Sequence, residues 1–248
     1  MKETRYVFEQ PELWQILAAN VAVAFGAFIQ SGTGFGMGLL CVPLLTLIDP
    51  VFAPGSFLLA SMFQNSVMVA RNRRGLRPDW LGAILPGIVM GSVAAYFVLK
   101  NLKGPGVELA IGFTILFAVA MSAVGVRVTV GRNTLVGGGA VAGMMSTVAG
   151  VPGPPLILLL QNEVGVQIRA NLGITFMCGS FASITALYLS GRFGGLHALL
   201  GFSLLPGILT GSLLAGPFAR FLDRAFLRPA LLVLVSFGGL ALILRNLL

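Results

Sequence analysis

The chain has 248 residues, of which 56% are hydrophobic and only 10% are charged, and its mean hydropathy is +0.94. Soluble domains carry about a quarter charged residues, so this composition excludes a soluble globular protein and predicts a chain embedded in lipid. The net charge is +8. Because the basic residues lie mostly in short links between apolar runs, we interpret them as topology signals and headgroup contacts, which argues against nucleic-acid binding.

Apolar runs follow one another along the chain, and several reach the roughly 17–25 residues that a spanning helix needs. Glu3, Glu9 and Glu12 disrupt the basic start of a signal peptide, so we interpret the first run as a retained membrane helix. The predicted runs are 13–31, 35–48, 54–70, 81–99, 107–126, 135–149, 154–160, 170–189, 196–215 and 229–244.

Two breaks between these runs are rich in glycine. The first reads GTGFG at 32–36, and the second reads AGVPGPP at 149–155. Gly34 and Gly150 match in these breaks, and at the same spacing Gly75 matches Gly191, each in a link after an apolar run. The correspondence indicates two related halves.

A longer pattern supports this duplication, because LPGIxxGSxxA occurs at 85–95 and again at 205–215. We predict two repeats, residues 1–130 and 131–248, which together form one transmembrane domain. Independent use of small residues for helix packing would give a similar pattern and is the alternative.

The basic links orient the repeats. Arg residues are densest at 71–77, and further basic residues lie at 127–132 and 220–228, so the positive-inside rule places these links in the cytoplasm. The links at 100–103 and 190–192, and both termini, are then outside, although 100–103 holds two lysines. The predicted fold is an all-α integral membrane protein with two inverted-topology repeats, each a broken or re-entrant helical hairpin plus three transmembrane helices.

The glycine-rich breaks are the predicted transport site. Non-helical backbone inside a bilayer must line protein or water, and matching breaks in inverted repeats are typical of transporter sites. Helix N-termini offer unpaired N–H groups and partial positive charge to an anion, which glycine allows to come close. Helix packing by the glycines is the alternative. The substrate-binding candidates at the breaks are Gln30, Ser31, Thr33, Gly34, Phe35, Gly36, Ser146, Thr147, Gly150, Val151 and Gly153.

Polar residues inside apolar runs add Gln64, Asn65 and Ser180 as weaker candidates. Such residues are costly in a membrane and invite a functional interpretation, and Gln64 matches Ser180 at the repeat spacing. Hydrogen bonding between helices explains them equally well.

The sequence offers little for catalysis or for a bound metal. Acidic, basic and histidine side chains lie near the ends of the apolar runs, so a carboxylate proton relay is not expected. One histidine and two cysteines leave no metal-ligand set, and no nucleotide or other cofactor motif is present. We expect no metal, no cofactor and no enzymatic activity.

The two breaks resemble those of the sulfite exporter TauE/SafE family of anion transporters. Residues 32–45 fit the family's glycine-rich stretch that leads into apolar residues and proline, and 150–156 fit it loosely. RRGLRPDW at 73–80 fits its basic link followed by Asp-Trp. The resemblance implies transport of sulfur-containing anions, such as sulfite, sulfoacetate or other organosulfonates. It also implies functional roles for Gly34, Gly36, Gly150 and Gly153.

We therefore expect a transporter of small anions that works by alternating access in a cell membrane, with the bacterial inner membrane as the favoured location. A passive anion channel and a non-transporting membrane subunit stay open as alternatives, and so does a homo-oligomer. A channel needs a continuous polar stripe. Polar residues here gather at the breaks, which favours a carrier.

Overall fold

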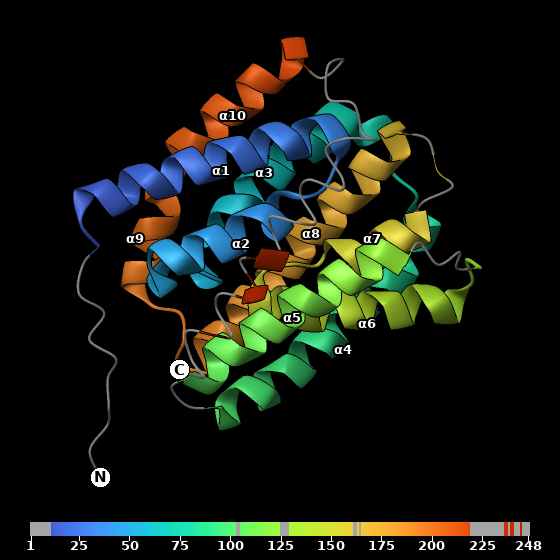
Figure 1. The fold of residues 1–248 in the computed structure, drawn as a ribbon. Helices are drawn as coiled ribbons and strands as arrows, with labels where there is room; N and C mark the ends of the chain where they lie inside the picture. The colour runs from blue at the N-terminus through green and yellow to red at the C-terminus, as the bar shows by residue number, and fades with distance from the viewer. Residues whose placement is uncertain are drawn as a thin grey trace.

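The computed structural model describes residues 11–102, 105–124, 129–160, 163, 165–218, 236–237, 239–240 and 244. Regular secondary structure within these residues is helical (Figure 1). The first part of the chain forms α1 (Leu13–Thr33), α2 (Met37–Ile48), η1 (Pro50–Phe52), α3 (Gly55–Asn72), η2 (Arg73–Gly75), α4 (Pro78–Asn101) and α5 (Pro105–Val124). The second part forms α6 (Arg132–Ala149), α7 (Gly153–Leu160), α8 (Gly165–Leu189), α9 (Gly195–Ser203) and α10 (Leu205–Phe218).

The outer surface of the bundle is apolar. Phe97 in α4, Phe181 in α8 and Leu213 in α10 are each more than half exposed. Five candidate spans in the described part of the chain are long and apolar enough to cross a membrane. Lipid is therefore the natural solvent of this surface, and the predicted all-α membrane class is confirmed.

Each glycine-rich break ends a helix in the same way. Gly34 follows α1 with φ 91°, and Gly150 follows α6 with φ 71°, so both lie in the left-handed region that glycine adopts without strain. The helices after the breaks are short: α2 has 12 residues and α7 has 8. At 1.5 Å per residue, neither could cross a hydrocarbon core of about 30 Å.

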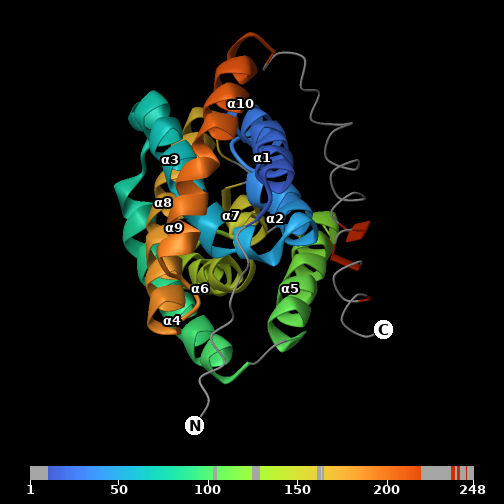
Figure 2. The ribbon, with the colours of Figure 1, turned by 90° about the vertical axis from the view of Figure 1, so that its left-hand side faces the viewer.

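The repeated LPGIxxGSxxA pattern packs helices against each other. In α4, a Cβ atom added to Gly87 or Gly91 would collide with backbone oxygens of α6. In α10, a Cβ atom on Gly207 or Gly211 would collide with backbone oxygens of α1. The two copies therefore make the same type of close backbone contact, which is the usual role of small residues between membrane helices. Figure 2 shows α10 beside α1 and α4 beside α6.

A further extensive helix contact is that of α3, which packs along α8. Ser61 in α3 and Ser180 in α8 meet there, with their hydroxyl oxygens 3.3 Å apart. α8 also packs against α4, and α3 packs against α9.

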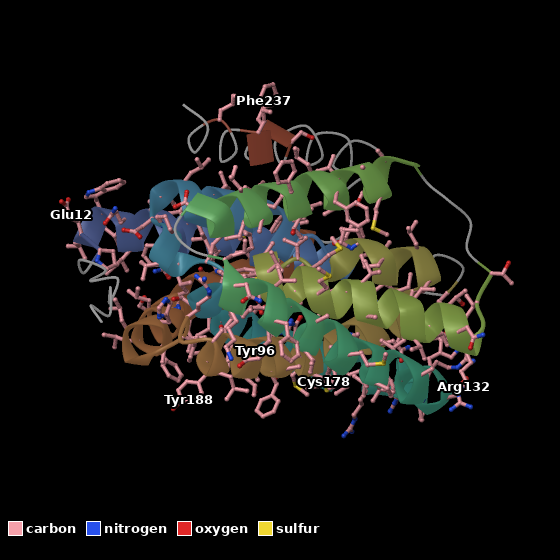
Figure 3. The ribbon with its side chains drawn as sticks, turned by 90° about the horizontal axis from the view of Figure 1, so that it is seen from below. Glu12, Tyr96, Arg132, Cys178, Tyr188 and Phe237 are labelled. Atoms are coloured by element: carbon pink, nitrogen blue, oxygen red, sulfur yellow. The ribbon has the colours of Figure 1, made fainter. Side chains whose placement is uncertain are left out.

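The links group at the two ends of the bundle. Figure 3 shows Glu12, just before α1, and Arg132, at the start of α6, at opposite ends. Contacts between Arg77 and Glu163 and between Arg169 and Asn72 join the links around 71–77 and 163–169 at one end. Arg192 contacts the carbonyl oxygens of Leu99 and Leu102 and joins the links that we predict outside. The inverted orientation of the repeats, and which end faces the cytoplasm, stay predictions.

Candidate functional site

The two glycine-rich breaks meet inside the bundle. Gly38, in the first turn of α2, lies so close to the second break that an added Cβ atom would be 2.5 Å from the carbonyl oxygen of Gly150. Gly150 also faces Val42 of α2 and Phe57 of α3. Backbone from residues far apart in the sequence is therefore in direct contact.

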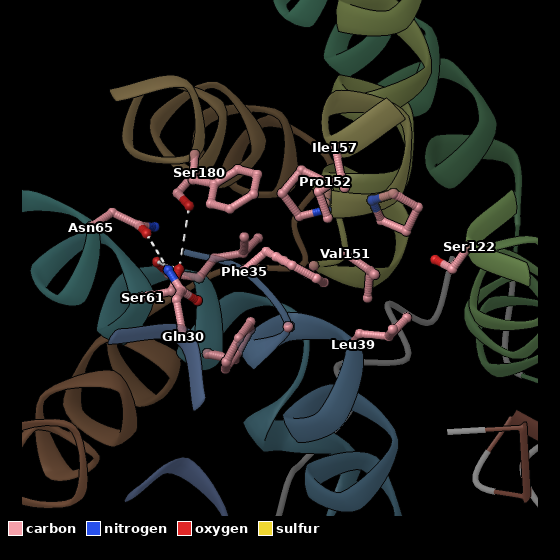
Figure 4. Close-up of a pocket in the computed structure, with 18 residues that line it drawn as sticks. Gln30, Phe35, Leu39, Ser61, Asn65, Ser122, Val151, Pro152, Ile157 and Ser180 are labelled. Carbon is pink, nitrogen blue, oxygen red and sulfur yellow. Dashed lines mark hydrogen bonds between the residues drawn. The ribbon is translucent and has the colours of Figure 1, made fainter. Parts of the chain in front are cut away.

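A cavity lies where the breaks meet (Figure 4). The space open to the centre of a water molecule is about 40 Å³, which is enough for a few waters or an ion of similar size. α1, α2, α3, α5, α7, α8 and both breaks contribute to its wall. The lining residues are Gln30, Phe35, Gly36, Gly38, Leu39, Phe57, Leu58, Ser61, Asn65, Ser122, Gly150, Val151, Pro152, Gly153, Pro154, Ile157, Phe176 and Ser180.

The first break supplies free backbone donors. Gly36 has φ 103° and precedes α2, whose first internal hydrogen bond runs from Leu40 N to Gly36 O. The N–H groups of Met37, Gly38 and Leu39 therefore have no partner within the helix. The positive end of the α2 dipole lies at the cavity, because Gly36 and Gly38 both line it.

The second break supplies fewer donors. The N–H of Gly150 already bonds to Ser146 O at 2.7 Å, and that of Val151 bonds to Met145 O at 3.4 Å. α7 begins at Gly153, and the prolines around its start have no N–H group. The second break thus contributes mainly apolar wall and the dipole of a short helix.

A buried pair of amides adds polar side chains. Gln30 in α1 donates from Nε2 to Asn65 Oδ1 in α3 at 2.7 Å, and the two residues are only 3% and 2% exposed. Asn65 Nδ2 has no hydrogen-bond partner among the described residues. The assignment of amide oxygen and nitrogen can be exchanged, but either arrangement leaves one N–H₂ group for a ligand.

Hydroxyl groups complete the polar wall. Figure 4 shows Ser61 and Ser180 beside Gln30 and Asn65, whereas Ser122 of α5 lies across the cavity near Val151. Ser61 and Ser122 are not among the predicted site residues. Each is a hydroxyl inside an otherwise apolar run, and that signal could have identified them.

The structure brings some of the predicted residues to the cavity and directs others away. Those that line it are Gln30, Phe35, Gly36, Asn65, Gly150, Val151, Gly153 and Ser180. Those that do not are Ser31, Thr33, Gly34, Gln64, Ser146 and Thr147.

The predicted residues away from the cavity join helices. Gln64 donates to Ser31 Oγ at 2.9 Å and accepts from Ser212 Oγ, so it connects α1, α3 and α10. In the second part of the chain, Ser183 of α8 donates to Ser146 Oγ and accepts from Thr147 Oγ1, each at 2.9 Å. These side chains therefore form hydrogen bonds between helices, which is the alternative to a role in the site that we gave above for polar residues such as Gln64.

The hydroxyl of Thr33 remains within the first break. It lies 2.9 Å from Ile29 O and 2.7 Å from Phe35 O, and accepts a weaker bond from Phe35 N. Gly34 lies beside it and faces α8 instead of the cavity. Both residues therefore fix the shape of the break without lining the cavity.

The cavity is neutral. Its described lining contains no acidic, basic or histidine side chain, and no group of potential metal ligands occurs among the described residues. The available chemistry is hydrogen-bond donation from amides, hydroxyls and helix N-termini. That set suits reversible binding of a small anion.

Comparison with known families gives one match. The model of the family described as Sulfite exporter TauE/SafE matches residues 19–242, a range that contains both breaks and the whole described lining of the cavity. No curated protein and no solved structure matched the chain.

Proposed function

The chain belongs to the sulfite exporter TauE/SafE family, whose members are membrane transporters, and we propose that it carries small sulfur-containing anions across the membrane by alternating access. Sulfite, sulfoacetate and other organosulfonates are the proposed substrates. The observation that carries this proposal is the neutral, donor-lined cavity between the two broken helix pairs.

Its chemistry favours a partly dehydrated oxyanion. Burial of a charge is costly unless hydrogen bonds replace its water. The unpaired N–H groups at the start of α2 and the free amide N–H₂ of the Gln30–Asn65 pair can do so. An anion with several oxygens on one centre can accept from these donors and from a serine hydroxyl at once.

Two features support alternating access over free conduction. The cavity is small, whereas a conducting pore needs a continuous polar path. The proposed inverted repeats supply two sets of equivalent contacts, α4 with α6 and α10 with α1, between which the site lies.

Anion exchange in proteoliposomes tests the proposed function. Sulfite, thiosulfate, sulfoacetate and a simple carboxylate are assayed in parallel for uptake and counterflow, with protein-free liposomes as the control. We expect saturable counterflow of a sulfur oxyanion. Conductance without saturation would favour a channel, and the absence of any anion flux would contradict the proposal.

A variant of the first break connects that flux to the site. Gly34→Val places a branched side chain at φ 91° and against Arg169, so the break cannot keep its shape. We expect the variant to insert into the membrane and to lose transport. Normal transport rates in the inserted variant would show that transport does not depend on the shape of the first break.

The proposed orientation has its own test. Arg73→Cys, in a chain with Cys41 and Cys178 replaced by Ala, should react with a membrane-impermeant thiol reagent only from the cytoplasmic side. Labelling from outside would show that the orientation is the reverse of the predicted one, with both termini in the cytoplasm.

A further inference from the structure

The candidate span Gly195–Ala215 is interrupted where α9 meets α10. Regular helix ends at Ser203 and resumes at Leu205. Pro206 follows at once and has no N–H group to bond within the helix. In an unbroken α-helix the N–H of Gly207 would donate to Ser203 O, because each N–H bonds to the carbonyl four residues earlier. In this structure the N–H of Gly207 donates to another helix instead.

The side chain of Asn20 in α1 is inserted in place of that bond. Its Oδ1 accepts from Gly207 N at 2.9 Å, and its Nδ2 donates to Ser203 O at 2.9 Å. Nδ2 also donates to Ile16 O at 3.0 Å. These partners fix the orientation of the amide, since a backbone N–H needs the oxygen and the carbonyls need the N–H₂. A side chain inserted into the helical ladder is a known cause of a kink.

The other copy of the LPGIxxGSxxA pattern provides a comparison within the same chain. Pro86 matches Pro206, but α4 continues through Pro86 without interruption. α6 presents Val136 O to the glycine after Pro86, as α1 presents Asn20 O to the glycine after Pro206. Valine has no polar group to insert. Asn20, and not the proline alone, therefore accounts for the interruption.

The interruption lies between close backbone contacts with two different helices. In α9, a Cβ atom added to Gly201 would be 2.9 Å from Ser56 O of α3. In α10, a Cβ atom added to Gly211 would collide with Ala24 O of α1. One part of the span is thus held against α3 and the other against α1. A change of bend between them moves α1 relative to α3.

α1 and α3 hold the two members of the amide pair in the cavity. Gln30 belongs to α1, Asn65 belongs to α3, and their side chains are joined at 2.7 Å. The first break follows α1 directly. Asn20 itself does not line the cavity. Movement of α1 relative to α3 therefore changes the polar wall of the cavity, although the joint lies outside it.

We propose that Asn20 is a positioning residue for transport, whose amide keeps the joint between α9 and α10 open as a hinge for the movement of α1 against α3. The inference rests on the proposed function, because it names a hinge of the alternating-access cycle. The N–H of Gly207 has two acceptors, Asn20 Oδ1 in the bent span and Ser203 O in a straight one. Hinges are a few residues that absorb a backbone change of this kind.

The first test removes the inserted amide. Asn20→Leu has nearly the shape of asparagine but no polar group, so Gly207 N and Ser203 O can only bond to each other. We expect the kcat of sulfite counterflow to fall about tenfold or more, with KM within about threefold of wild type, because the cavity is not touched. Val136→Leu is the matched control in the other half and should keep both values within about twofold of wild type.

The second test straightens the span without changing α1. Pro206→Ala restores an N–H group at the joint and removes the ring that opposes a straight helix. We expect the kcat to fall about threefold or more at nearly constant KM. Pro86→Ala is the matched control, because α4 is already continuous at that position. Its kcat should stay within about twofold of wild type.

The third test measures the bend by the distance between two spin labels. Leu199→Cys in α9 and Leu213→Cys in α10 place the labels at exposed positions, in a chain with Cys41 and Cys178 replaced by Ala. With Asn20 present, the distance should change when sulfite is added. With Asn20→Leu, we expect one distance that sulfite does not change.

Labels on α4 control for general effects of sulfite on the membrane. Gly82→Cys and Phe97→Cys lie on either side of Pro86, at exposed positions of an unbroken helix. Their distance should be the same with and without sulfite.

The outcomes separate the hinge from the proposed function. Unchanged kcat in Asn20→Leu and Pro206→Ala, beside active wild type, would overturn the hinge alone, and so would a fixed distance between α9 and α10 in active protein. A rise in KM as large as the fall in kcat would show that Asn20 supports the site as static packing and would overturn the hinge too. Wild-type protein with no anion flux would overturn the proposed function itself, and the role of the hinge in transport with it.

Discussion

The two glycine-rich breaks share a backbone turn but differ in what lies behind them. Gly34 is backed by Arg169 and Ile168 of α8, and the helix that follows it begins with free N–H groups. Gly150 is backed by the apolar side chains of Val42 and Phe57, and prolines follow it. We therefore propose that the first break supplies most of the contacts to the transported ion, whereas the second break forms an apolar wall.

The contact between the breaks should be the most sensitive point. Gly38→Ala would force a Cβ atom to within 2.5 Å of Gly150 O, so the breaks must separate. Displacement of about 1 Å at a site can cost roughly 100-fold in rate, and we expect a counterflow loss of this size per inserted protein. Gly137→Ala is the control, because nothing lies within 4 Å of its added Cβ. Equal rates in the two variants would refute a close contact.

The helices before the breaks provide a second comparison. Gln30 and Ser146 occupy matching positions, but Gln30 lines the cavity whereas Ser146 bonds to Ser183. Gln30→Leu should raise the KM for the anion about tenfold, as expected for the loss of about 1.4 kcal/mol of binding. Ser146→Ala should leave KM unchanged and lower stability by about 1 kcal/mol. The same KM shift in both would contradict the unequal roles.

The glycines of the turns provide a third comparison. Gly34→Ala and Gly150→Ala each place an L-residue at positive φ, which costs about 1–2 kcal/mol. Gly150→Ala also crowds Val42 at 3.2 Å and Phe57 at 3.3 Å, so we expect its lower thermal midpoint in detergent to come without a KM change. Gly34→Ala pushes against Arg169 and should raise KM as well. A KM change in Gly150→Ala but not in Gly34→Ala would mean that the second break, and not the first, determines the affinity for the anion.

The smallest effect is expected at Gly153. Its φ is not positive, and an added Cβ would make only ordinary contacts, 3.7 Å from Ile157 and 3.9 Å from Phe176. Gly153→Ala should raise stability by about 0.4–1 kcal/mol and keep transport within about twofold of wild type. A large transport loss in this stable variant would mean that the ion touches the second break closely.

The sequence predicts the helical membrane class and the places where helices break, because both depend on local chemistry. Low charge, long apolar runs and glycines that can adopt positive φ are visible without any tertiary contact. The pattern at 85–95 and 205–215 also led us to predict that the two segments are related. It does not show that each segment packs on a helix from the other half of the chain, since the partner is chosen by the fold.

The composition of the site is harder to predict, because helix rotation decides it. Gln30 and Ser31 are neighbours in sequence, but successive residues of a helix point about 100° apart. Gln30 therefore lines the cavity while Ser31 bonds to Gln64. Ser122 is recognisable as a hydroxyl inside an apolar run, but only the position of α5 in the fold places it at the cavity.

The glycine contacts of α4 with α6 and of α10 with α1 have a mechanical consequence. At these glycines backbone meets backbone in both pairs, so the helices have little room to slide past each other there. Each pair should then move as a rigid body, and each body contains a helix from both halves of the sequence. Under the proposed alternating access, these two pairs are the units that we expect to move, and they are interleaved along the chain.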